Sequence, residues 1–189
     1  MIIEGIITTT DAAGQVHLAA IGPHVDEEAG RTGRLERFSL RPFATSQTAA
    51  NLATIPEGVF HLVDDVLLLA RVVTKALVTA PACRPAARVR GWVLADACRA
   101  YEFQIEESDI SQERLRHEAR VVAMHEGRPF VGFNRAKHAV VEAAILATRL
   151  HLLGAEEIRR QMAALEPLVE KTGGSREHEA WKVIEGYVG

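Results

Sequence analysis

The residues best suited to chemistry are three hydroxyls that closely follow an arginine. Thr45, Ser46 and Thr48 come shortly after Arg41, and the small residues behind them predict a helix over 45–53. Free N–H groups and the positive end of the helix dipole favour an anion at such a start. A phosphate monoester suits these groups, because hydroxyls, amides and a guanidinium all donate to its oxygens. An ordinary capping turn beside a solvated arginine explains the same residues, so that alternative stays open.

A second helix start carries cations. Asn134 is a cap residue before a helix predicted over 136–153, and Arg135 and Lys137 lie beside it. The helix dipole favours acidic residues in a first turn, so a bound anion would offset the conflict. The other interpretation is that both side chains point into water or reach a carboxylate elsewhere in the chain. These cations are therefore a second candidate contact for a phosphate or for an anionic substrate.

The common catalytic motifs are absent from this sequence. It contains no nucleophile elbow, no Walker-type loop and no glycine-rich dinucleotide motif. The eight histidines lack the spacing of a zinc site, and we expect no bound metal. The residues alone therefore name no catalytic group.

The composition is that of an ordinary globular protein. The 189 residues are 48% hydrophobic with a formal net charge of −3, which disfavours a protein that wraps nucleic acid or coats anionic membranes. No basic leader precedes an apolar run, and no apolar stretch is long enough for a transmembrane helix. Cys83 and Cys98 are too few for a disulfide scaffold. We expect reduced thiols, a cytoplasmic location, and neither nucleic-acid nor membrane partners.

Strand patterns come first along the chain and helix patterns come last. β-Branched runs and alternation predict strands at 2–10, 15–22, 35–43, 59–63, 91–106 and 115–124, the fifth with a kink near 97–98. Helical signals predict short helices over 45–53 and from 64–65 to about 73, and longer ones over 136–153, 156–172 and 175–187. This order indicates an α+β protein with a β-barrel or sandwich body and an appended helical subdomain.

One charged pair falls on the first of the long helices. Glu142 and Arg149 lie two turns apart among apolar residues. A partly buried ion pair that fixes this helix on the barrel is favoured over an acid–base pair.

Three segments of the chain match one family. The first runs from His17 to Pro23 and ends in an Ala-x-x-Gly-Pro turn, and the second is Arg41-Pro42-Phe43 with its hydroxyl cluster and Asn51-Leu52. The third and most specific is 132–137, continued by 141–145 and 148–150. Together they resemble the FMN-binding split-barrel proteins catalogued as domain-of-unknown-function family 447. Two positions depart from the pattern, because Ala20 stands where a proline is expected and His17 where an amide side chain is common.

The resemblance implies an FMN-binding split β-barrel over residues 1–130 and a C-terminal helical subdomain over 131–189. The family is related to flavin reductases and pyridoxamine-phosphate oxidases, which implies a homodimer with FMN near the interface. The cofactor-binding residues expected here are Arg41, Thr45, Ser46, Thr48, Asn51, His17, Ala20, Arg135 and Lys137. Asn51 shares a helix face with Thr48 and can reach a ribityl hydroxyl, and the strand around His17 offers backbone groups to the flavin ring.

The function that follows is an FMN-dependent oxidoreductase acting on a small molecule. With a flavin bound, hydride chemistry belongs to the cofactor, which explains why no catalytic dyad stands out. The flavin would accept a hydride from a donor such as NAD(P)H and pass electrons to an unidentified acceptor. The alternative is a flavin- or ligand-binding module without turnover, acting as a carrier or regulatory partner. A third interpretation is a dimeric structural protein whose helices form a partner surface.

Overall fold

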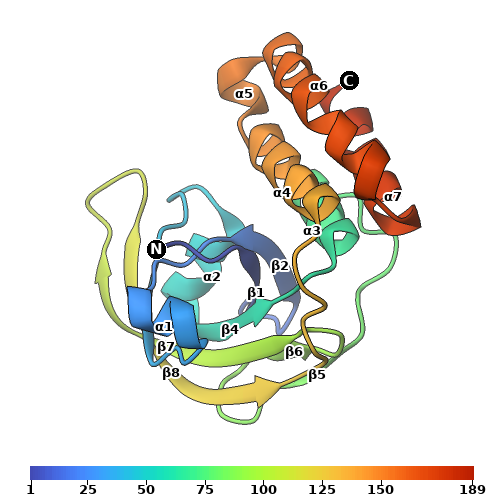
Figure 1. Cartoon of the computed structure of the whole chain (residues 1–189). Helices are drawn as coiled ribbons and strands as arrows, with labels where there is room; N and C mark the ends of the chain where they lie inside the picture. The colour runs from blue at the N-terminus through green and yellow to red at the C-terminus, as the bar shows by residue number, and fades with distance from the viewer. The chain divides into compact units, whose positions relative to one another are not determined.

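The chain forms two compact units, one built on a sheet and one built from helices (Figure 1). The computed structural model describes all residues from 1 to 189. The sheet unit comprises residues 1–63 and 81–129, and the helical unit comprises 64–80 and 130–189. The fold is therefore α+β, as the order of patterns predicted. The segment 64–80 lies with the C-terminal helices, although the sequence prediction kept it within residues 1–130.

A six-stranded antiparallel sheet organises the first unit, with the strand order β2-β1-β4-β7-β8-β3. Its strands are β1 (Gly5–Thr10), β2 (Val16–Ile21), β3 (Arg37–Leu40), β4 (Glu57–Leu62), β7 (Arg99–Asp109) and β8 (Arg116–Glu126). Two short strands, β5 (Cys83–Pro85) and β6 (Trp92–Leu94), pair separately. Every predicted strand is present, and the kink predicted near 97–98 is the gap between β6 and β7.

The two edges of the sheet meet at one end only. The β1–β2 ladder continues past both strands, through Ile2 opposite His24 and then Met1 opposite Val25. His24 also exchanges two backbone hydrogen bonds with Ser39 of β3, at 2.8 and 2.9 Å. Pairing therefore runs from β2 through the whole sheet to β3 and returns to the continuation of β2. The outer edge of β2 itself carries no strand.

Aromatic side chains fill the interior of this sheet. Phe38 is packed 5.2 Å from Phe103 and 5.9 Å from Phe60, measured between ring centroids, and all three rings are buried. The Tyr101 hydroxyl donates to the Gly33 carbonyl at 2.6 Å, so it is satisfied inside the core. Burying each such ring contributes roughly 2–3 kcal/mol. The core fixes the end of β3, from which the candidate site begins.

Two short helices interrupt the strands of the first unit. The first, α1 (Glu27–Thr32), lies in a polar, glycine-containing segment whose sequence predicts no helix. Asp26 caps its start, and Gly33 ends it with a φ of 68°, a conformation that glycine adopts readily. The second, α2 (Gln47–Thr54), confirms the helix predicted over 45–53 and packs beside β1 and β2.

A buried histidine fastens the segment 81–97 to the sheet. The Leu94 N–H donates to His61 Nε2 at 3.0 Å, so the ring proton lies on Nδ1 and is donated to the Ile6 carbonyl, also at 3.0 Å. Burial lowers the pKa of His61 to about 4. His61 is therefore neutral, and its two hydrogen bonds join the segment 81–97 to β1.

A buried carboxylate holds the same segment from a neighbouring strand. Glu102 is fully buried and accepts hydrogen bonds from the Ala87 and Arg88 N–H groups at 2.7 and 2.6 Å. His125 Nε2 lies 2.5 Å from the same carboxylate. Burial by itself would raise the pKa of Glu102, but these hydrogen bonds lower it below its usual value.

The second unit packs α3, α4, α6 and α7 against one another. Its helices are α3 (Val66–Thr74), α4 (Arg135–Thr148), α5 (Leu150–Leu153), α6 (Ala155–Thr172) and α7 (Ser175–Val188). Five buried alanines let neighbouring helices approach α4 closely, at positions 136, 139, 143, 144 and 147. The predicted helices are confirmed, although the first breaks at Arg149 and Ser175 follows the cap residue Gly174. No helix of the chain is both long and apolar enough to span a bilayer.

The predicted ion pair between Glu142 and Arg149 is wrong. Both side chains are exposed, and no hydrogen bond or ion pair joins them. Seven residues of helix span about 10 Å along the axis, which puts the two charges beyond pairing distance.

Candidate functional site

The turn from β3 into α2 is hydrogen-bonded to the residues that immediately precede β8. The Leu115 N–H donates to the Pro42 carbonyl at 3.0 Å, and the Ala44 N–H donates to the Glu113 carbonyl at 2.8 Å. These bonds extend the β3–β8 pairing beyond both strands. We call residues 41–48 the β3–α2 corner.

The start of α2 leaves several hydrogen-bond donors unused. Ser46 is the N-cap, because its hydroxyl accepts from the Ala49 N–H at 3.1 Å. The N–H groups of Gln47 and Thr48 have no partner in the protein. The hydroxyls of Thr45, which is exposed, and Thr48, which is 3% exposed, are also unpaired. Donors of this kind at a helix start suit an anion.

Two guanidinium groups flank the same corner without a carboxylate partner. Arg41 is exposed and forms no ion pair. The pKa of His24 is lowered mainly by burial, and then by the positive charges of Arg41 and of the N-terminal ammonium. Arg114 lies with its guanidinium carbon 3.8 Å from the centroid of Phe43 and donates through Nη1 to the Arg41 carbonyl at 3.3 Å. The corner therefore concentrates positive charge.

Asn51 lies beside this corner, but its side chain is already bonded. It is 2% exposed, and its Nδ2 donates to Thr9 Oγ1 of β1 at 3.0 Å. Its Oδ1 accepts from Gln47 Nε2 at 2.7 Å. Asn51 fixes α2 on the sheet in this structure, and the predicted ribityl contact stays a prediction.

His17 and Ala20 belong to β2, the edge strand. Their backbone partners across the ladder are Thr9 and Ile6 of β1. Because alternate residues of an antiparallel edge strand turn their N–H and C=O groups away from the neighbouring strand, part of the β2 backbone, including that of Ala20, faces outward. That strand lies in the same unit as the corner, and α2 packs against both β1 and β2.

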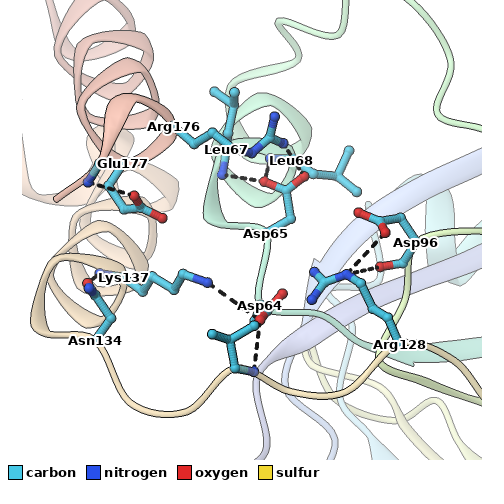
Figure 2. A network of polar contacts seen from close by, with 12 residues as sticks. Asp64, Asp65, Leu67, Leu68, Asp96, Arg128, Asn134, Lys137, Arg176 and Glu177 are labelled. Carbon is cyan, nitrogen blue, oxygen red and sulfur yellow. Dashed lines mark hydrogen bonds and ion pairs between the residues drawn. The ribbon is translucent and has the colours of Figure 1, made fainter.

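Arg135 and Lys137 belong to the helical unit, where Lys137 has an ion-pair partner and Arg135 has none. Asn134 caps α4 by accepting from the Lys137 N–H at 3.1 Å, and the Lys137 ammonium lies 3.5 Å from the Asp64 carboxylate (Figure 2). Asp64 is buried, so the anion beside this helix start is a carboxylate of the chain. Arg135 is exposed and unpaired. A flavin contact by either residue stays a prediction.

Two residues beside the β3–α2 corner were not predicted from the sequence. Arg114 falls in the turn before a predicted strand, and only the pairing of Phe43 with Arg114 brings it to the corner. His24 reaches the corner through its pairing with Ser39. Both depend on contacts between distant segments. The resulting set of amides, hydroxyls and guanidiniums can bind a dianion such as a phosphate monoester.

Solved structures share this fold. An FMN-bound protein from Methanosarcina mazei, named MM1853, is 24% identical and superposes with a TM-score of 0.83 over 98% of this chain and 94% of that chain. The flavin reductase of styrene monooxygenase from Pseudomonas putida S12 is 16% identical, with a TM-score of 0.54 over 67% of this chain and 82% of that one. An FMN-binding protein from Thermus thermophilus is 13% identical, with a TM-score of 0.52 over 67% and 76%. These likenesses establish the fold.

Sequence comparison supplies the family. No curated protein matches this sequence. The N-terminal domain of the proteins of unknown function DUF447 matches residues 3–128, and a second DUF447 region matches residues 134–186. Since the two matches together span most of its length, the chain belongs to the DUF447 family.

Proposed function

We propose that this protein binds FMN and holds the flavin phosphate at the β3–α2 corner. The observation that carries the proposal is the unpaired positive charge of Arg41 beside unpaired amides and hydroxyls at the start of α2. A structure of the same family, MM1853, is described as FMN-bound, which supports the choice of ligand.

The donors at the corner fit a terminal phosphate. A phosphate monoester carries close to two negative charges at neutral pH and accepts several hydrogen bonds at once. The N–H groups of Gln47 and Thr48 and the Thr45 hydroxyl supply donors, while Arg41 supplies charge. The outward backbone groups of β2 suit the polar edge of a flavin ring, because each presents a donor or an acceptor.

We also propose that the protein is an oxidoreductase acting on a small molecule. Bound FMN would supply the hydride and electron transfer, so this chain need only bind, orient and shield it. Fold relatives described as a flavin reductase and as a 2-nitrobenzoate nitroreductase support this class. A flavin carrier without turnover shares the same binding site and is separated from the enzyme only by the reduction experiment below.

The architecture proposed for this function is a split barrel in a homodimer. The ladder that closes through His24 and opens along β2 supports the split barrel within residues 1–130. The residues 131–189 are then its helical subdomain. Exposed apolar side chains support a second subunit, since Phe133 is 91% exposed and Val131 is 81% exposed.

Visible spectroscopy of the purified protein tests the proposal. We expect a yellow protein that releases FMN on denaturation, or a colourless one that quenches the fluorescence of added FMN. A protein that neither contains nor takes up FMN would refute the proposal. Anaerobic bleaching by NADH or NADPH, followed by reoxidation with an acceptor, is expected of an enzyme and not of a carrier.

A further inference from the structure

Two contacts hold the Arg114 side chain in place, although it lies at the surface. Its guanidinium carbon lies over the Phe43 ring, 3.8 Å from the ring centroid. Its Nη1 donates to the Arg41 carbonyl at 3.3 Å, so the side chain is held by both the aromatic ring and the backbone. Stacking of this kind fixes a guanidinium while leaving its remaining N–H groups free.

Arg114 has no ion-pair partner within the protein. No carboxylate pairs with Arg114, whereas Arg116, two residues along the chain, lies 2.6 Å from Glu118. Arg41 is likewise unpaired and belongs to the same corner. An anion bound at the corner would interact favourably with both positive charges and with the start of α2.

We propose that Arg114 is a second phosphate-binding arginine, which makes the site selective for flavins that end in a phosphate monoester. The proposal rests on FMN binding and goes beyond it by assigning a residue from the β7–β8 turn to the cofactor. Phe43 acts as the platform that orients this guanidinium, and Arg41 supplies the second positive charge. Riboflavin, which lacks the phosphate, gains nothing from either arginine.

The selectivity between FMN and riboflavin tests this role. Both dissociation constants are measured by fluorescence quenching for the wild type, Arg114→Ala, Arg114→Lys and the matched control Arg116→Ala. We expect Arg114→Ala to weaken FMN binding about 10- to 100-fold, the range for one charge-assisted hydrogen-bonding group, and to leave riboflavin binding unchanged. Arg114→Lys should recover part of the loss, because lysine restores the charge without the planar stack. Arg116→Ala should change neither constant.

Three results would separate the possible failures. Wild-type protein that binds neither flavin refutes the proposed function itself. Tight FMN binding that Arg114→Ala leaves intact refutes only the role of Arg114. Equal loss of FMN and riboflavin binding in Arg114→Ala would show that the arginine supports the shape of the site and does not read the phosphate. The thermal unfolding midpoint of each flavin-free variant checks that the fold is retained.

Discussion

Two helix starts in this molecule carry cations, and they use them in opposite ways. At α4 the Lys137 ammonium lies beside the buried carboxylate of Asp64, so the chain supplies its own anion. At the β3–α2 corner, Arg41 and Arg114 have no carboxylate partner. The first charge is balanced within the chain, and the second pair of charges is not.

The contrast teaches that a cation at a helix N-terminus is not by itself a sign of a ligand. What decides the matter is whether a distant part of the chain returns an acidic side chain to the same place. Asp64 precedes α3 and Lys137 lies in α4, so only the packing of the helical unit reveals that they meet. Breaking each helix start separately should therefore have different consequences.

The largest effect on stability is expected from removing the internal anion at α4. Asp64→Asn leaves the Lys137 ammonium, which is 23% exposed, without its partner. Because the Asp64 carboxylate is buried while the Lys137 ammonium stays partly hydrated, losing this pair should lower the free energy of unfolding by about 1–3 kcal/mol, measured by urea denaturation. The control is Asp96→Asn, whose carboxylate is 80% exposed beside Arg128 and should cost about 0.5 kcal/mol or less. If both variants cost the same, the buried Asp64 carboxylate contributes no more to stability than an exposed ion pair does.

The corner should show the reverse pattern, with a loss of binding and little loss of stability. Arg41→Ala combined with Thr45→Ala removes one charge and one hydroxyl donor, both exposed. FMN binding is expected to weaken by about 2–4 kcal/mol, measured by fluorescence titration. Arg34→Ala, which removes another exposed and unpaired arginine of the same unit, is the control and should leave affinity unchanged. Unchanged affinity in the double variant would show that the flavin phosphate does not bind at this corner.

The caps of the two helices offer a smaller test of the same contrast. Asn134 accepts from Lys137 N–H and also donates to the Thr172 carbonyl at 3.0 Å, whereas Ser46 accepts only from Ala49 N–H. Asn134→Ala should cost about 2 kcal/mol of stability and Ser46→Ala about 1 kcal/mol. Chemical denaturation of the flavin-free protein measures both. Equal costs would mean that the Thr172 contact contributes nothing.

Local patterns predicted most of the elements but not their closure or their charge balance. The strands and long helices follow from alternation and helical periodicity, and Asp65 caps α3 as its side chain predicts. The helix α1 escaped because six residues in a polar, glycine-containing segment carry little periodicity. The pairing of His24 with Ser39, and of Phe43 with Arg114, joins segments that no local pattern connects. The hydroxyl cluster at the corner was visible in the sequence, while its second arginine was not.

The smallest expected effect is a change in the titration of His24, which reports the charge at the corner. Burial and the Arg41 guanidinium lower the pKa of His24, so Arg41→Ala should raise that pKa, and imidazole resonances followed by NMR across a pH series would measure the change. Bound FMN should also raise the pKa of His24 in the wild type, because the phosphate adds negative charge beside Arg41. If neither change moves the titration, the Arg41 charge is already balanced as that of Lys137 is, and the contrast between the two helix starts disappears.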